Sequence, residues 1–216
     1  MFSFFKWVKD LFFRTKKEEV HMPLQGADYW DNKWPKNEVK YKARGRYAMD
    51  VRNLILNKSY VLDTVTDIYK EKGNYDQQAL ALLKFVISHM TYVGDEKLYD
   101  RPEFWQNPEI TLAMGRGDCE DGALLLASLM RVVGIPAFRV KLCAGWVKTK
   151  EGQEGHAYVI YLAEDSKWYT LDWCYWPEAS TFSFNKNPHS ENADYNDIWW
   201  TANDQYTWAQ KSTEVA

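Results

Sequence analysis

The chain has 216 residues, a length that fits one domain with extended ends. Hydrophobic residues make up 46% and charged residues 26%, which is ordinary globular usage and indicates neither a disordered chain nor a membrane-embedded one. The net charge of -3 argues against nucleic-acid binding, which needs a clustered basic surface. Three cysteines, Cys119, Cys143 and Cys174, cannot all pair within one chain, and their sparsity favours a reducing, cytoplasmic compartment.

The first 17 residues, MFSFFKWVKDLFFRTKK, predict an amphipathic helix. One helical face would gather five apolar residues, namely Phe4, Phe5, Val8, Leu11 and Phe12. Lys6, Lys9 and Asp10 interrupt any signal-type apolar run, and a transmembrane span would need about 20 largely apolar residues. We expect this face to dock on the domain or on a partner, and contact with a membrane surface through residues 1–17 is the less favoured alternative.

Residues 18–47 mix proline, glycine, charge and aromatics without a clean period, which predicts an irregular arm around the domain. Apolar residues then recur at three and four positions over 50–70 and 76–89, which predicts two helices. The stretch 92–117 contains two prolines and several glycines. It predicts a long loop with a short helical turn near 109–114.

The run GDCEDGALLLASLMRVVGIP carries the start, body and end of a helix. Asp118 can cap the helix, Gly134 suits the left-handed position after its last turn, and Pro136 prevents continuation. Because the body is apolar all round, we expect this helix to be buried at the centre of the domain.

Three segments rich in aromatic and branched residues follow, at 137–147, 156–162 and 167–175, and predict strands. Another short strand is expected around Ile198, in a tail that folds back over the sheet. Helices followed by a mostly antiparallel sheet predict an α+β fold in which the central helix packs on the sheet.

Cys119 stands at the first turn of the predicted central helix. Unpaired N–H groups and the positive end of the helix dipole favour a thiolate there and can hold an oxyanion. Asp118, Glu120 and Asp121 oppose this, because three carboxylates beside the sulfur raise its pKa unless they cap the helix, point away or bind a cation. A buried structural cysteine is the alternative.

His156 begins the second predicted strand and Asp172 lies in the third. A hairpin with a three-residue turn at 163–165 would pair residues whose numbers sum to 328, and would place His156 directly opposite Asp172. A carboxylate at that distance fixes the imidazole tautomer, so the spacing predicts a Cys119, His156 and Asp172 triad.

The segments GRGDCEDGALLLASLMRVVGIPAFRV, GHAYVIYL and WYTLDW resemble the core of the transglutaminase-like superfamily, and in particular its bacterial and viral cysteine proteinases of papain-like fold. The resemblance covers roughly residues 100–175. It implies Cys119 as nucleophile, His156 as general base and acid, and Asp172 as the residue that orients the histidine. It also implies calcium at Asp118 and Glu120, although helix capping and solvent exposure are the favoured interpretation and no cofactor is expected to be required.

Trp105 and Gln106 precede the cysteine at a distance where papain-like sites draw a second oxyanion donor, and an indole N–H or an amide could serve. Packing and surface exposure are the respective alternatives. Cys143 and Cys174 do not begin a helix and are expected to be structural. His21, His89 and His189 have no nearby nucleophile or metal-ligand spacing, and no role is assigned to them.

Attack of Cys119 on an amide carbonyl would give an acyl-enzyme, which predicts a cysteine peptidase or amidohydrolase acting on peptide or isopeptide bonds of a protein or peptide substrate. A transglutaminase that transfers the acyl group to an amine is one alternative, and a non-catalytic binding module is another. We expect an amphipathic helix at 1–17, an arm at 18–47, the catalytic domain at 48–205 and a tail at 206–216. The flanks resemble small phage-encoded relatives, which implies action in the cytoplasm of a bacterial or phage-infected cell.

Overall fold

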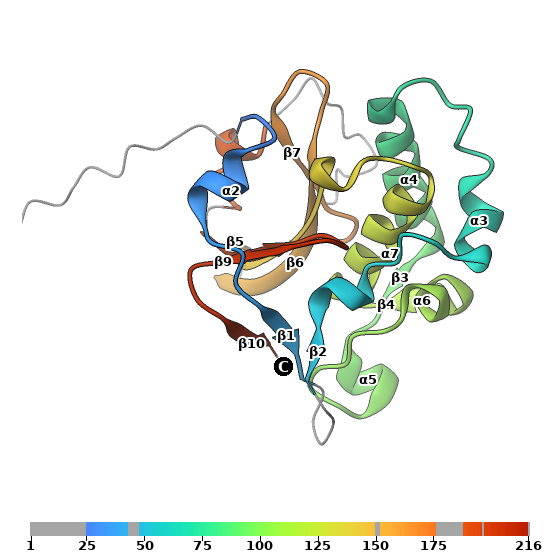
Figure 1. Ribbon diagram of the computed structural model, residues 1–216. Helices are drawn as coiled ribbons and strands as arrows, with labels where there is room; N and C mark the ends of the chain where they lie inside the picture. Colours follow the sequence, from blue (N-terminus) through green and yellow to red (C-terminus); the bar gives the residue numbers. More distant parts are fainter. Residues whose placement is uncertain (1–24, 43–47, 150–151, 176–187, 196, 216) are drawn as a thin grey trace, which may run out of the picture.

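The computed structural model describes residues 25–42, 48–149, 152–175, 188–195 and 197–215 (Figure 1). The amphipathic helix expected at 1–17 lies outside these residues. Across the described segments, no helix has both the length and the apolar character needed to cross a lipid bilayer.

Helices and strands alternate along the chain, with most helices preceding the main sheet. The α-helices are α2 (Tyr29–Lys33), α3 (Tyr60–Thr66), α4 (Tyr75–His89), α5 (Asp95–Tyr99), α6 (Pro108–Met114) and α7 (Cys119–Val132). The 3-10 helices are η1 (Val51–Leu54), η2 (Ala137–Arg139) and η4 (His189–Glu191). The strands are β1 (Val39–Tyr41), β2 (Met49–Asp50), β3 (Thr91–Tyr92), β4 (Arg116–Gly117), β5 (Val140–Lys148), β6 (Gln153–Leu162), β7 (Trp168–Leu171), β8 (Asp197–Ala202), β9 (Thr207–Ala209) and β10 (Thr213–Val215).

The main sheet is antiparallel, with its five strands in the order β7-β6-β5-β8-β9. Helix α7 packs on β5 and β6, while α3, α4 and α6 pack on α7, so one face of the sheet is covered by helices (Figure 1). A central helix carrying Cys119 against a mostly antiparallel sheet is the predicted α+β fold, and the structure confirms it.

Helix α7 is buried along nearly its whole length, as its apolar composition predicts. Leu124, Leu125 and Leu126 point in different directions around the helix, yet each is fully buried. The end of the helix also follows the sequence, because Gly134 has φ +108° just beyond it, a conformation that side chains strongly disfavour.

The opposite face of the sheet is covered by the segment that the sequence predicts to be an irregular arm. Residues 25–42 contain helix α2 and strand β1, so this part of the arm is more ordered than expected. Trp30 on α2 is fully buried and meets the ring of Trp168 on β7 at 6.3 Å. Burial of this large aromatic ring holds α2 against the sheet.

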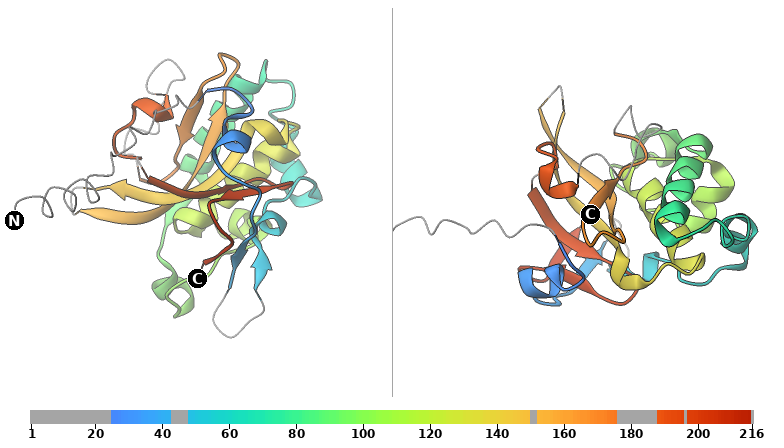
Figure 2. Two further views of the ribbon diagram at one scale, coloured as in Figure 1. Left: turned by 60° about the vertical axis from the view of Figure 1, so that its left-hand side comes forward. Right: turned by 90° about the horizontal axis from the view of Figure 1, so that it is seen from above.

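The C-terminal segment contributes strands to the main sheet and to a three-stranded sheet with the order β10-β1-β2. Strand β8 confirms the short strand expected around Ile198, but it pairs with β5 inside the sheet and does not fold over it. Within the expected tail, β9 pairs with β8, and β10 pairs in parallel with β1 (Figure 2). The β5–β8 and β1–β10 pairings join chain segments that are far apart in sequence, which local patterns do not reveal.

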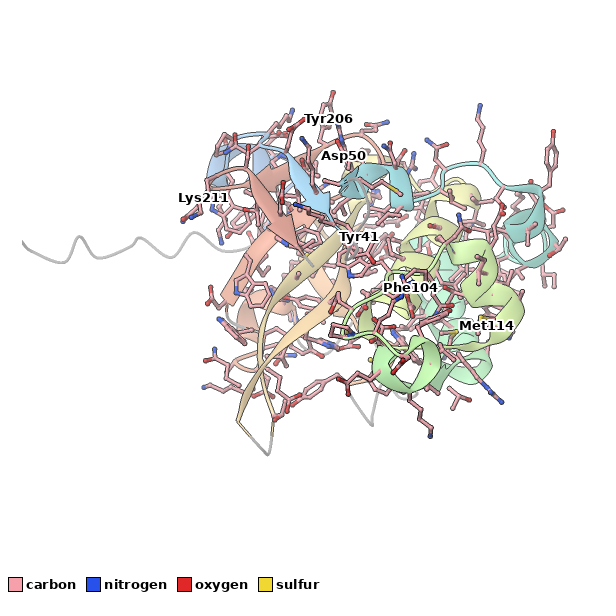
Figure 3. The ribbon with its side chains drawn as sticks, turned by 90° about the horizontal axis from the view of Figure 1, so that it is seen from below. Tyr41, Asp50, Phe104, Met114, Tyr206 and Lys211 are labelled. Carbon is pink, nitrogen blue, oxygen red and sulfur yellow. The ribbon has the colours of Figure 1, made fainter. Side chains whose placement is uncertain are left out.

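Strand β1 also reaches the segment that precedes α6. The hydroxyl of Tyr41 accepts the backbone N–H of Trp105 at 3.1 Å, at the place where Tyr41 and Phe104 are labelled in the view from below (Figure 3). The rings of Tyr41 and Trp105 are stacked with centroids 5.2 Å apart. The N-terminal arm therefore supports a residue that lies beside Cys119.

Two helix predictions need correction. The helix expected over 50–70 is divided into η1 and α3, because Ser59 caps α3 by accepting the N–H of Leu62 at 3.0 Å. The loop expected over 92–117 contains α5 as well as α6, and α6 begins with Pro108 in its first turn after the cap residue Asn107.

Candidate active site

Cys119 is the first residue of α7 and lines a cavity of about 320 Å³ together with His156. The thiol donates to Glu120 Oε2 at 3.1 Å, and the backbone N–H of Ala157 points at the sulfur. Because Ala157 follows His156 on β6, this hydrogen bond places the sulfur next to the strand that carries the histidine.

The first turn of α7 is held from the other side by Trp173. Its indole N–H donates to the carbonyl oxygen of Cys119 at 3.1 Å. Gly122 permits this close approach, since any Cβ at that position would collide with the indole ring. The glycine that follows the DCED run therefore has a packing role beside the nucleophile.

His156 and Asp172 form a hydrogen-bonded ion-pair geometry, with Nε2 of the histidine 2.6 Å from Oδ2 of the aspartate. Their side chains are 8% and 2% exposed, so little water competes for the contact. With Nε2 engaged by the carboxylate, Nδ1 is the nitrogen left to exchange a proton with a thiol. The structure thus brings together all three residues predicted as a triad.

The strand register that we expected for this pair is wrong by two residues. The observed β6–β7 pairs, such as Val159 with Leu171 and Leu162 with Trp168, sum to 330. The turn is longer than expected, because Ala163 bonds Lys167 across it and Ser166 has φ +66°. An even shift preserves the face that each side chain points to, and the contact forms between diagonal neighbours just beyond the end of β7.

Asp172 accepts hydrogen bonds at both oxygens. Tyr195 donates its hydroxyl to Oδ2 at 2.6 Å, and the backbone N–H groups of Cys174 and Tyr175 donate to Oδ1 at 3.1 and 3.3 Å. Burial alone would raise the pKa of Asp172, but the charge of His156 and these hydrogen bonds lower it below its ordinary value. The carboxylate is therefore kept ionised beside the imidazole.

Tyr195 was not identified from the sequence. It lies in a polar, aromatic segment that has no motif, and only the fold brings it to Asp172. Its ring packs edge-to-face on Tyr158 with centroids 4.8 Å apart, and Tyr158 in turn stacks on His156 at 5.9 Å. Among the described residues the buried hydroxyl of Tyr158 has no hydrogen-bond partner, which distinguishes it from Tyr195.

Five carboxylates gather behind Cys119. They belong to Asp95, Glu103, Asp118, Glu120 and Asp121. Asp118 is the cap residue of α7, as predicted, and its N–H donates to Asp121 Oδ2 at 3.3 Å. The expected solvent exposure is wrong for Glu120, which is 4% exposed because the segment carrying Glu103 and Trp105 covers it.

Burial has a large electrostatic effect on this carboxylate cluster. It raises the pKa of Asp95 and of Asp121 to about 7, and it raises the pKa of Glu120 well above the usual range. Burial, together with the charges of Glu120 and Asp118, also raises the pKa of Cys119 well above that of a free thiol. Formation of the Cys119 thiolate therefore requires that a cation or bound protons neutralise these carboxylates.

The residues present fit a hard cation. One ligand oxygen each of Asp95, Glu103 and Glu120 lies within 4.8 Å of the other two, and the same holds for Asp95, Asp118 and Asp121. Asp95 Oδ1, Asp118 Oδ1 and Glu120 Oε1 are buried without a hydrogen-bond partner in the described structure. Calcium takes six to eight oxygen ligands, and unpartnered buried carboxylate oxygens are the donors that it uses.

The two oxyanion candidates, Trp105 and Gln106, differ in their position relative to the cavity. Trp105 lines the cavity, but its indole N–H donates to Glu103 Oε1 at 2.6 Å. Gln106 is buried away from the cavity lining, and its amide N–H groups go to Asp121 Oδ2 at 2.5 Å and to the Arg116 carbonyl at 3.2 Å. Gln106 therefore orders the carboxylate cluster.

Of the other described cysteines and histidines, only Cys174 contacts a residue of the predicted triad. Cys143 is fully buried on the far face of the sheet, and Cys174 lies beside Asp172 with its sulfur 3.8 Å from Oδ1. His89 Nε2 contacts the Leu112 carbonyl, and His189 Nδ1 contacts Thr170 Oγ1, each at 2.6 Å. His21 lies outside the described residues.

A cysteine at the start of a buried helix, facing a histidine and an aspartate at the edge of an antiparallel sheet, defines a papain-like α+β thiol site. The family model of the transglutaminase-like superfamily matches residues 63–173, just over half of the chain. The chain therefore belongs to the transglutaminase-like superfamily. No curated protein matches it.

Solved structures with a similar fold include LapG from Legionella pneumophila. The EGTA-treated form has a TM-score of 0.54 and 21% identity over 69% of this chain and 74% of that one. The calcium-bound form has the same TM-score and identity, over 68% and 75%. A likeness at this level of identity establishes a shared fold.

Proposed function

We propose that the protein is a cysteine peptidase or amidohydrolase that cleaves peptide or isopeptide bonds through Cys119, His156 and Asp172. The observation that carries the proposal is the 2.6 Å contact between His156 and the buried Asp172, because His156 lines the same cavity as Cys119, a cysteine at a helix N-terminus. Membership of the transglutaminase-like superfamily supports it.

The bond changes can be followed atom by atom. The Cys119 sulfur attacks the amide carbonyl carbon while His156 Nδ1 takes the thiol proton. The tetrahedral intermediate then collapses, the C–N bond breaks, and the imidazolium returns the proton to the leaving amine. Water, deprotonated by His156, attacks the resulting thioester, releases the carboxylic acid and restores the thiol.

Asp172 and the first turn of α7 stabilise the charges that form during this reaction. Asp172 holds Nε2 and stabilises the imidazolium that forms when the thiol gives up its proton. The first-turn N–H groups of α7 have no partner within the helix, and those of Cys119 and Glu120 would donate to the carbonyl oxygen as negative charge develops on it. The backbone N–H of Ala157 also points at the sulfur and favours its thiolate form.

We further propose that the carboxylate cluster holds calcium, with Asp95, Glu103, Asp118 and Glu120 as ligands. Bound calcium would offset the negative charge that raises the Cys119 pKa. LapG, which has a similar fold, has been solved in a calcium-bound form. The three buried oxygens without partners on Asp95, Asp118 and Glu120 support the same assignment in this chain.

Alkylation kinetics of the three cysteines test the proposal. Full-length protein is treated with iodoacetamide at neutral pH, and the modification of each cysteine is followed by peptide mass spectrometry in wild type, Cys143→Ala and Cys174→Ala. We expect Cys119 to react at least about tenfold faster than the other two, and His156→Gln to remove this advantage. Equal rates at all three positions, or a Cys119 rate that ignores His156, would overturn the proposal.

A further inference from the structure

Strand β8 contains a bulge that redirects one tryptophan. Ala144 of β5 pairs with Trp200, but Gly145 pairs with Ile198, so Trp199 has no partner in the ladder. Side chains of consecutive residues normally point to opposite faces of a sheet, yet Trp199 and Trp200 both line the cavity that contains Cys119. The bulge is what turns Trp199 toward the thiol.

The residues around Trp199 leave its ring open. Trp146 on β5 meets it edge-to-face with centroids 4.9 Å apart, and the two side chains are 37% and 39% exposed. Gly155, next to His156, forms the floor, since a Cβ at that position would lie only 3.1 Å from the Trp199 ring. Trp146 and Trp199 therefore form an exposed aromatic surface next to Gly155, on the strand that carries His156.

The charge around this surface is negative. Three glutamates line the cavity and no described lysine or arginine does. Glu103 and Glu120 belong to the carboxylate cluster assigned to calcium, so Glu214 is the cavity glutamate outside that cluster, and its Oε2 lies 3.6 Å from Nζ of the exposed Lys42. Asp197 is exposed and pairs with Trp146 across the ladder, so it adds a carboxylate at the open side that does not belong to the cluster behind Cys119. Lys148, two residues beyond Trp146, does not line the cavity.

We propose that Trp146, Trp199 and Gly155 form a subsite for a cationic side chain, lysine or arginine, of the residue that supplies the scissile carbonyl. The aliphatic stem would lie on the indole face above Gly155, and the charged head would lie near Asp197 and Glu214. A cation over an indole face is favoured electrostatically, and the surrounding carboxylates disfavour an acidic side chain at the same place. The inference rests on the proposed function, because it assigns substrate preference to the same cavity.

The test uses three alkylating reagents that share one reactive group and differ in the amino-acid side chain next to it. Full-length protein is treated separately with the chloromethyl ketones of N-acetyl-lysine, N-acetyl-norleucine and N-acetyl-glutamate, in which the thiolate displaces chloride. Norleucine has an unbranched stem like that of lysine but no charge. The second-order rate at Cys119 is measured by mass spectrometry in wild type, Trp199→Ala and Phe138→Ala. Phe138 is a similarly exposed aromatic outside the cavity.

We expect the lysine reagent to react about fivefold faster than the norleucine reagent, with the glutamate reagent slowest. Trp199→Ala should abolish the preference for the lysine reagent over the norleucine reagent, and Phe138→Ala should leave that ratio of rates unchanged. Equal lysine and norleucine rates, a faster norleucine rate, or a preference that survives Trp199→Ala would overturn the subsite. A Cys119 that no reagent modifies faster than Cys174 would instead overturn the proposed function.

Discussion

The hydroxyl of Tyr195 and the imidazole of His156 bind the same oxygen of Asp172, each at 2.6 Å. Two donors on one carboxylate oxygen fix its direction and keep it ionised, while the backbone N–H groups after β7 hold the other oxygen. Asp172 is thus positioned by a residue from the distant C-terminal segment.

Tyr195→Phe should slow alkylation of Cys119 by about tenfold, because a hydrogen bond to a charged group contributes about 1.5 to 3 kcal/mol. The matched control is Tyr158→Phe, which removes a hydroxyl from a neighbouring buried ring but breaks no hydrogen bond that the described structure contains. Similar losses in the two variants would show that Tyr195 acts only by packing.

The same variant should show a characteristic pH dependence of stability. The pKa of Asp172 in the folded protein lies below its ordinary value. The ionised carboxylate therefore stabilises the fold at any pH above the ordinary pKa, and this stabilisation is lost as the pH falls through the folded pKa. The free energy of unfolding of Tyr195→Phe should therefore be lower than that of wild type at neutral pH. The difference should shrink below about pH 4, as measured by urea denaturation.

Asp172→Asn should reduce activity on the order of a thousandfold with little change in fold. The asparagine carbonyl can still accept the N–H groups of Cys174 and Tyr175, but its amide would then face His156 and favour the wrong tautomer. The readouts are Cys119 alkylation and the circular dichroism spectrum. An asparagine variant with a wild-type rate would exclude Asp172 from the chemistry.

Calcium should raise both the alkylation rate of Cys119 and the melting temperature, by about 5 to 10 °C at saturating metal. Asp95→Asn should weaken both effects, because it removes a carboxylate that faces the cluster. Glu96→Gln, on the adjacent exposed position of α5, is the control and should leave both effects intact. If calcium and EGTA give the same rate and melting temperature, the carboxylate cluster does not hold this cation.

Lys141 lies on the far face of the sheet, buried over the ring of Trp208 at 4.3 Å. Burial lowers its pKa to about 7, whereas an unfolded chain keeps it near 10.4. The unfolded chain binds the extra proton between these values, so the free energy of unfolding should rise with pH over this window. Lys141→Met should flatten that rise and stabilise the protein near pH 6, as seen in denaturant titrations. An unchanged slope would show that Lys141 is not its source.

Local signals made part of the site predictable. The cap residue Asp118, the apolar body after Cys119 and the glycine at 134 together define α7, because caps and periodicity act within a few residues. His156 could be placed on a strand for the same reason. These signals are sufficient for the fold class and for the positions of the cysteine and histidine.

Other parts of the site depend on contacts that sequence patterns do not encode. The β6–β7 register follows from a turn in which Ser166, not a glycine, takes a positive φ, so its length could not be read from residue types. Asp95 and Glu103 reach Glu120 only because the segment from α5 to α6 folds against α7. Tyr195 and Trp199 arrive through the pairing of β8 with β5, a non-local contact.

The most direct measurement is acyl-enzyme formation with p-nitrophenyl acetate, monitored by rapid-mixing absorbance and by mass spectrometry of the acetylated peptide. We expect a burst close to one equivalent of p-nitrophenol per chain, with the acetyl group on Cys119. The burst should be absent in Cys119→Ala and at least about a hundredfold slower in His156→Gln. A full burst in Cys119→Ala, or acetyl groups spread over lysines instead of Cys119, would contradict the assignment of Cys119 and His156 as nucleophile and base.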